Sequence, residues 1–205
     1  MTMAKKGVLT VLSGFSGAGK GTIMKEIVNR YPYFLSISAT TRKPREGEVD
    51  GVDYFFHSRE EFEAMIKNDE LIEWAEYVGN YYGTPRKAVE KQLAEGQDVL
   101  LEIEMQGGML VKKQFPEALL LFVTPPSFQE LKRRLCERGT ETEEEIANRM
   151  QRAIEEVAYM PLYDYLIIND ELEQAVQDVH QIIQTEHMRV AYNTEMIHSF
   201  KKENK

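Results

Sequence analysis

A glycine-rich stretch near the start of the chain, GFSGAGKGT, has the composition of a phosphate-binding loop. It spans residues 14–22, and the spacing of Gly14, Gly19 and Lys20 matches a P-loop. Glycines let the backbone curl until several N–H groups point at a phosphate, and a following helix N-terminus adds partial positive charge. Lys20 supplies a mobile cation for the β- and γ-oxygens. The pattern predicts a nucleoside triphosphate site. A glycine-rich turn with an incidental lysine is the disfavoured alternative, because the stretch joins an apolar run to a helical pattern.

The residue after this lysine departs from the usual pattern. Ser or Thr commonly stands there and helps to hold Mg²⁺, whereas this chain has Gly21, with Thr22 one place later. Mg²⁺ keeps several water ligands and often binds through substrate phosphates. We therefore expect Mg²⁺ to accompany the triphosphate without a direct protein ligand.

Two arginines form a second candidate site after the next apolar run. Arg42 and Arg45 lie three residues apart around a turn that contains Pro44. Neighbouring guanidinium groups repel each other unless an anion lies between them, and a phosphate monoester accepts forked hydrogen bonds from both. The pattern predicts the phosphate of an acceptor here, and a solvated charged loop is the alternative.

Further charged residues follow later in the chain. Glu102 and Glu104 end an apolar run, and at a period of two they point to the same face, although an exposed strand end is the alternative. The stretch of residues 131–152 contains the arginines Arg133, Arg134, Arg138, Arg149 and Arg152. Composition alone favours a solvated helical pair for this stretch.

Extended and helical patterns alternate along the chain and position these residues. We expect strands at residues 8–13, 34–39, 99–103, 118–124 and 165–168, and hairpin strands within residues 70–82. We expect helices to begin near Gly19, Ser58, Thr84, Gln106, Ser127, Thr142 and Leu172, with a further one near residues 189–200. A glutamate three residues after Ser58, Ser127 and Thr142 predicts a capping box at each of these three starts. Strands separated by helices form a parallel sheet covered on both faces, with ligands at the carboxyl ends of the strands.

The composition describes an ordinary globular chain. Its 205 residues suffice for one domain, and a formal net charge of −9 disfavours a nucleic-acid surface. The single cysteine, Cys136, allows no intrachain disulfide, and no apolar run approaches the length of a membrane span. We expect a cytoplasmic protein with neither a nucleic-acid nor a membrane partner. A monomer and a homo-oligomer are both compatible with the sequence.

In order and spacing, the motifs resemble those of guanylate kinases over residues 6–188. They stand at residues 38–45, 51–56, 73–74, 79–84, 98–107, 125–127, 138–141 and 168–170. The resemblance implies an α/β fold in which a P-loop parallel sheet flanked by helices carries a small GMP-binding lobe and a helical lid. It implies one domain at residues 1–205, with a core (5–35, 86–125, 160–188), a GMP-binding lobe (36–85), a lid (126–159) and a C-terminal helix and tail (189–205). The implied reaction is transfer of the γ-phosphoryl group of ATP to GMP, and also to dGMP.

The resemblance also implies roles for individual residues. ATP would bind Gly14, Phe15, Ser16, Gly17, Ala18, Gly19, Lys20, Gly21, Thr22, Arg134, Arg138, Asn169 and Asp170. GMP would bind Ser38, Arg42, Arg45, Tyr54, Glu73, Tyr82, Thr84, Glu102 and Glu104. The catalytic set would be Lys20, Arg42, Arg138 and Arg149, with Mg²⁺ bound through ATP.

Glu73 has a direct chemical reason to read the base. Guanine presents two adjacent donors, N1–H and the 2-amino group, and a carboxylate accepts from both, whereas adenine would leave the carboxylate unpaired. Thr84 donates to O6, caps the helix that follows, or does both. Packing is the alternative role for Tyr54 and Tyr82, and an exposed carboxylate is the alternative for Glu73.

Two other functions remain to be distinguished. A kinase for AMP or thymidylate shares the P-loop, but the motifs between Ser38 and Thr84 argue against it. A non-catalytic scaffold module of the same family typically lacks phosphate-loop and acceptor residues, whereas this chain keeps Lys20, Arg42 and Arg45.

Overall fold

The computed structural model describes residues 6–77, 79–137, 139 and 142–203. Its main sheet has five parallel strands in the order β2-β7-β1-β8-β9. The strands are β1 (Leu9–Gly14), β2 (Phe34–Leu35), β7 (Val99–Glu102), β8 (Leu119–Thr124) and β9 (Tyr165–Ile168). The parallel sheet predicted from the alternating pattern is thereby confirmed, and the carboxyl ends of β1 and β7 bring the P-loop beside Glu102.

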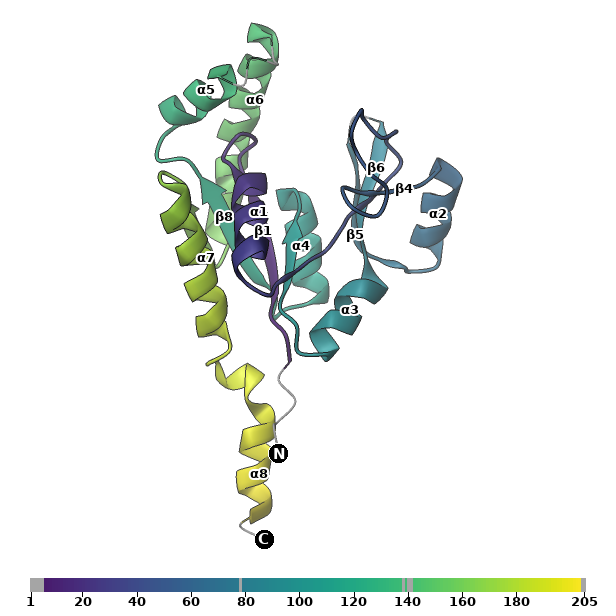
Figure 1. Cartoon of the computed structure of the whole chain (residues 1–205), viewed down its shortest axis with the longest axis vertical. Coiled ribbons are helices and arrows are strands. Elements are labelled where there is room, and N and C mark those ends of the chain that lie inside the picture. The colour runs from purple at the N-terminus through teal and green to yellow at the C-terminus, as the bar shows by residue number, and fades with distance from the viewer. Residues whose placement is uncertain (1–5, 78, 138, 140–141, 204–205) are drawn as a thin grey trace.

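Helices cover both faces of the main sheet, as Figure 1 shows. Alternate residues of β1 separate the two cores, since Leu12 packs into the larger cluster and Val11 into the smaller one. The larger cluster contains α1 (Lys20–Arg30) and α7 (Leu172–Glu186), and the smaller contains α3 (Arg86–Ala94) and α4 (Met105–Gln114). Burial on both faces explains why these strands are apolar throughout rather than alternating.

A second sheet of four strands, in the order β4-β3-β6-β5, forms what we call the small lobe, residues 39–85. Its strands are β3 (Ala39–Thr40), β4 (Phe55–Phe56), β5 (Leu71–Tyr77) and β6 (Asn80–Pro85), and its helix is α2 (Arg59–Lys67). Phe62 of α2 is fully buried against Ala39 and Leu71. The capping box predicted at Ser58 is present, with both of its reciprocal hydrogen bonds to Glu61. In Figure 1 this lobe lies to the right of the main sheet.

The remaining helices extend the molecule at its two ends (Figure 1). At one end, α5 (Phe128–Glu137) and α6 (Glu143–Glu156) form what we call the α5–α6 pair, followed by the 3₁₀ helix η1 (Val157–Leu162). At the other end, η2 (Val190–Tyr192) leads into α8 (Thr194–Glu203), which extends away from the body. Within the part of the chain that the structure describes, no helix is both long and apolar enough to cross a bilayer.

Two predictions about local structure were wrong. The strand expected at residues 34–39 is two short strands in different sheets, because the chain leaves the main sheet after β2 and enters the small lobe at β3. Thr84 does not cap a helix: it lies in β6, and α3 begins after Pro85 without a side-chain cap. Both corrections concern the junction where the small lobe joins the core.

Candidate active site

The P-loop connects β1 to α1 through glycines that no other residue could replace without strain. Gly14 and Gly19 have φ values of 143° and 91°, in the region that favours glycine. A Cβ atom on Gly14 would lie 2.0 Å from the carbonyl oxygen of Val123, in the neighbouring strand. The loop is therefore pressed against the sheet, and α1 begins at Lys20, within the glycine-rich stretch of residues 14–22.

Lys20 lies over the loop. Its Nζ donates hydrogen bonds to the carbonyl oxygens of Gly14 and Phe15, at 2.8 and 3.1 Å. The same side chain lines the pocket described below. The ammonium group is thus held between the loop and the pocket, where it can meet an anion bound across both.

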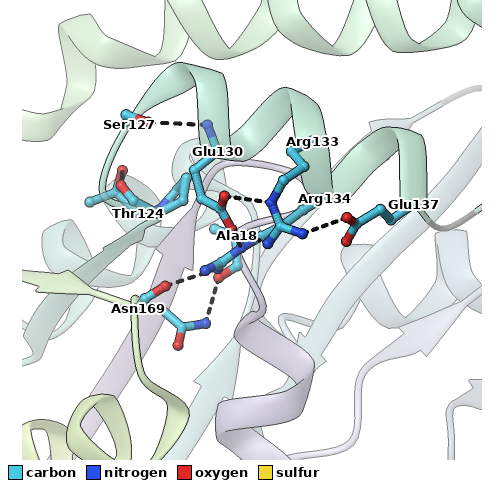
Figure 2. A network of polar contacts seen from close by, with 9 residues as sticks. Ala18, Thr124, Ser127, Glu130, Arg133, Arg134, Glu137 and Asn169 are labelled. Atoms are coloured by element: carbon cyan, nitrogen blue, oxygen red, sulfur yellow. Dashed lines mark hydrogen bonds and ion pairs between the residues drawn. The ribbon is translucent and has the colours of Figure 1, made fainter.

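A polar network braces the loop from β9 and α5 (Figure 2). The buried side chain of Asn169 donates from Nδ2 to the carbonyl oxygen of Ala18, at 2.8 Å. Arg134 donates from Nη1 to the carbonyl oxygen of Asn169 at 2.9 Å, and from Nε to Glu130 at 2.6 Å. Asn169 therefore holds the P-loop and, through Arg134, ties it to the α5–α6 pair. Asp170, which we also expected at the ATP site, is exposed.

We expect Gly19→Ala to distort this loop. A Cβ there would lie 2.4 Å from Nδ2 of Asn169, and the φ of 91° is already unfavourable for alanine. The variant should lose about 1–3 kcal/mol of stability and bind ATP at least about tenfold more weakly. Thermal unfolding and calorimetric titration with ATP measure the two effects.

Gly79→Ala is the matched control, since Gly79 has a φ of 74° but no neighbour within 4 Å of an added Cβ. It carries the same kind of backbone strain without the clash. If the two variants bind ATP equally well, the contact between Gly19 and Asn169 does not shape the loop.

A pocket of about 410 Å³ opens between the P-loop, the main sheet and the small lobe. This volume suits a nucleotide-sized ligand. The lining residues predicted from sequence are Lys20, Ser38, Tyr54, Glu73, Tyr82, Glu102 and Glu104. Those to which the sequence assigned no role include Asp53, Tyr77 and Gly107. The structure thus brings six of the nine predicted GMP-binding side chains to one cavity, whereas Arg42, Arg45 and Thr84 are not among its lining residues.

Glu73 forms part of the pocket wall because β5 is irregular. The pairing of β5 with β6 shifts by one residue between Leu71 and Trp74, and Leu71, Ile72 and Glu73 are all buried in succession. Such a bulge re-aims a side chain that regular alternation would point elsewhere. Thr84 of β6 donates its hydroxyl to Oε1 of Glu73 at 2.7 Å. Gly107 leaves room on the other side, since a Cβ there would lie 2.8 Å from Oε2.

Burial raises the pKa of Glu73 to about 7, against the lowering effect of its hydrogen bonds from Thr84. A raised pKa means that the folded protein holds the proton more tightly than the unfolded chain. This stabilisation is complete below the unfolded pKa of 4.5 and is lost as the pH rises through about 7. Among the described residues, no cation is a cause of the pKa shift of Glu73, so that burial dominates it.

We expect the free energy of unfolding of ligand-free Glu73→Gln, measured relative to the wild-type protein, to be higher at pH 8 than at pH 4.5. The amide removes the cost of ionising a buried acid, which is on the order of 2–3 kcal/mol for such a shift. Urea unfolding of the variant and the wild-type protein at both pH values measures the difference. A difference between the two proteins that is the same at both pH values would contradict the raised pKa.

The Arg42 side chain is paired with the carboxylate of Glu48, six residues later in the same chain. Its Nη1 and Nη2 donate to the two oxygens of Glu48, each at 2.9 Å, and its guanidinium lies 5.3 Å from the ring centroid of Tyr54. The hydrogen bonds from Arg42 and from the backbone N–H of Arg45 lower the pKa of Glu48 to about 2. Glu48 is thus the anion that pairs with the Arg42 guanidinium, and it bonds Arg45 only through the backbone N–H, although the sequence assigned it no role. The Arg45 side chain is exposed.

Glu102 and Glu104 both line the pocket but differ in setting. Glu102 ends β7 and reaches solvent through the open pocket, and partial desolvation raises its pKa against the opposing effect of Lys20. Glu104 is the exposed N-cap residue of α4.

A third carboxyl, the buried Glu156 of α6, was not predicted from the sequence. Burial, and after it repulsion from Glu104, raises the pKa of Glu156 to about 7. The residues around Glu156 in the sequence are charged and helical, so that nothing in the sequence distinguished it from an exposed residue.

The predicted Mg²⁺ role fits these side chains. Gly21 offers no donor of its own, Thr22 is exposed, and a Cβ on Gly21 would lie 3.7 Å from both carboxylate oxygens of Glu102. Among the described residues, no group of three or more acidic, histidine or cysteine side chains is arranged to ligate a metal. Mg²⁺ that is held by phosphate oxygens and water, with Glu102 accepting from a water ligand, is compatible with this arrangement.

The α5–α6 pair reaches the P-loop directly. Arg149 of α6 donates from Nη1 to the Ser16 hydroxyl at 3.2 Å. Arg138, to which the sequence analysis assigned ATP binding, lies outside the described residues, as do Thr140 and Glu141 of the same motif.

Comparison with known proteins identifies the family. The guanylate kinase family model matches residues 6–186. A guanylate kinase of Bacillus anthracis is 57% identical over 190 residues, which cover 91% of this chain and 92% of that protein. A guanylate kinase of Caldanaerobacter subterraneus subsp. tengcongensis is 49% identical over 204 residues, with 99% of each chain covered.

A solved structure agrees with these relatives. The crystal structure of guanylate kinase from Anaplasma phagocytophilum has a TM-score of 0.76 and 33% identity, covering 92% of this chain and 90% of that one. With this fold, and with a family model that spans nearly its whole length, the chain belongs to the guanylate kinase family.

Proposed function

We propose that the P-loop binds ATP and that the adjoining pocket binds GMP, so that the γ-phosphoryl group passes between them to give ADP and GDP. The observation that carries this assignment is the buried carboxyl of Glu73 in the pocket wall, to which the buried Thr84 hydroxyl donates at 2.7 Å. The Glu73 carboxylate matches the two adjacent donors on one edge of guanine, and the Thr84 hydroxyl, whose single O–H donates to Glu73 in this structure, would turn to donate to O6. The same contacts would accept dGMP, because they involve no sugar hydroxyl.

On the acceptor side, the base and the phosphate are bound by different groups. Glu73 would accept from N1–H and the 2-amino group, while Thr84 and Ser38 bind the base edge. Arg42, Arg45, Tyr54 and Tyr82 would bind the phosphate. Arg42 already lies beside Tyr54, so the phosphate would share its guanidinium with Glu48 or displace that carboxylate. Glu102 and Glu104 complete the pocket wall.

On the donor side, charge stabilisation is the main requirement. The loop N–H groups and Lys20 would bind the β- and γ-phosphates, and Arg134, Arg138 and Arg149 would approach the triphosphate. Mg²⁺ bound with ATP supplies further neutralisation of the phosphate charge. Asn169 contributes through the loop that it braces at Ala18.

The transfer needs no strong base. A phosphate oxygen of GMP is already a nucleophile at neutral pH, so that catalysis rests on alignment and on stabilising the charge of the moving group. The α5–α6 pair would act as the lid that excludes water and so prevents ATP hydrolysis. We place this reaction in the cytoplasm, with the two nucleotides as its ligands rather than a nucleic acid or a membrane.

Calorimetric titration with GMP, guanosine and AMP tests the pocket assignment. GMP should bind at least about a hundredfold more tightly than AMP, because adenine leaves the Glu73 carboxylate unpaired. Guanosine should also bind more weakly than GMP, because it lacks the phosphate assigned to Arg42. Equal affinities for GMP and AMP would overturn the role of Glu73 and Thr84.

A further inference from the structure

Arg152 of α6 contacts residues from two other parts of the molecule. Its guanidinium carbon lies 4.8 Å from the ring centroid of Tyr77, a distance typical of a cation–π contact. Its Nη2 lies 3.8 Å from Oε2 of Glu104, and its Nε lies 3.6 Å from Oε1 of Glu156 on its own helix. One side chain therefore contacts an aromatic ring and two carboxylates.

These contacts link the two sides of the nucleotide cleft. Tyr77 ends β5 in the small lobe, Glu104 caps α4 in the core, and both line the pocket. On the other side, α6 belongs to the α5–α6 pair, in which Arg149 reaches the P-loop through Ser16. Figure 1 shows α6 and the β5–β6 hairpin rising on either side of α4. Arg152 thus joins the element assigned to ATP with the lobe assigned to GMP.

We propose that Arg152 is a positioning residue that clamps the α5–α6 pair to the small lobe, so that binding of either nucleotide favours binding of the other. This inference rests on the proposed assignment of ATP to the P-loop and GMP to the pocket. A nucleotide that fixes the small lobe also fixes Tyr77, and Tyr77 fixes α6 through Arg152. Thermodynamic linkage then requires that the second nucleotide bind more tightly, by the same factor in either order.

These contacts favour arginine over lysine, and their strength determines how large the coupling between the two nucleotides is. A guanidinium stacks on an aromatic ring while its edge faces carboxylates, which a lysine ammonium cannot do as well. The Arg152 side chain is 43% exposed, so that each contact is weak on its own. An exposed cation–π contact changes an equilibrium by about two- to fivefold. We therefore expect a coupling of this order rather than an all-or-none switch.

The test is calorimetric titration with GMP, with and without adenylyl imidodiphosphate and Mg²⁺. In the wild-type protein the ATP analogue should tighten GMP binding, and in Arg152→Met the tightening factor should fall by about two- to fivefold. Arg133→Met is the matched control, because Arg133 lies on α5 and pairs with Glu130 and Glu137 of that same helix. This control should keep the wild-type factor.

Two further variants separate the clamp from a general loss of structure. Tyr77→Leu should lower the tightening factor as Arg152→Met does, and the double variant should lower it no further, because both remove one contact. Arg152→Lys keeps the charge and should give an intermediate factor. The proposal is overturned if Arg152→Met keeps the wild-type factor, or if the analogue does not tighten GMP binding in the wild-type protein. Failure of the wild-type protein to bind GMP at all would instead contradict the proposed function.

Discussion

Lys20→Met will lower kcat for GMP phosphorylation by about 100- to 1,000-fold. The ammonium group is held between the P-loop and the pocket, with Nζ 2.8 Å from the carbonyl oxygen of Gly14. Negative charge grows there as the γ-phosphoryl group leaves ADP, and methionine fills a similar volume without offsetting that charge. Steady-state kinetics at saturating ATP and GMP measure the effect on the transfer step.

Lys25→Met is the control for this prediction, since Lys25 is an exposed lysine on the same helix, α1. It should leave kcat within about twofold of wild type, as surface substitutions usually do. Thermal unfolding of Lys20→Met shows whether the lost bonds to Gly14 and Phe15 destabilise the loop. An unchanged kcat in folded Lys20→Met would remove Lys20 from the mechanism.

Glu73→Gln will lower kcat/KM for GMP by about 100-fold or more, while KM for ATP changes by less than about threefold. The glutamine amide keeps one acceptor but turns an N–H donor toward a donor of guanine, so that one buried bond is lost and a repulsive contact replaces it. Glu76→Gln is the matched control, because Glu76 lies on the same strand but is exposed. Equal losses for GMP and ATP would contradict a base-reading role.

Glu73 should also make GMP binding depend on pH, with weaker binding at lower pH. Only ionised Glu73 accepts from both guanine donors, and its pKa in the empty pocket is about 7. KM for GMP should therefore rise as the pH falls from 8 to 6 in the wild-type protein. The GMP phosphate also titrates near pH 6 and affects both proteins. The rise in KM for GMP must therefore be larger in the wild-type protein than in Glu73→Gln. Parallel trends in the two proteins would show that the phosphate alone is responsible.

The parts of the site that residue chemistry predicted without the family resemblance are those formed by contiguous residues. The P-loop could be predicted because its chemistry lies within nine consecutive positions between one strand and one helix, and the capping boxes at Ser58 and Thr142 are equally local. The parallel sheet followed from strands separated by helices, and the structure confirms it. Local pattern sufficed for these elements because their partner residues are neighbours in the chain, although it failed for the helix cap expected at Thr84.

The remaining parts depend on contacts between distant segments. The split of residues 34–39 between two sheets leaves no trace in an alternating pattern, because both halves are extended. The shift in β5 that places Glu73 in the pocket depends on its pairing with β6. Arg152 lay in a stretch whose composition favoured a solvated helical pair, and Glu156 drew no prediction. Only the position of Glu104 and Tyr77 beside α6 reveals their setting. Tertiary packing, rather than propensity, determined each of these.

The most direct test of the proposed reaction is a coupled ADP-release assay with ATP and Mg²⁺ that offers GMP, AMP and dTMP in turn. We expect rapid ADP release with GMP and almost none with AMP or dTMP, because Glu73 and Thr84 match guanine alone among these bases. Turnover with AMP or dTMP at the rate seen with GMP would contradict the assignment of the base pocket. Absence of turnover with every acceptor, in folded protein that binds GMP, would favour a non-catalytic scaffold of the same family.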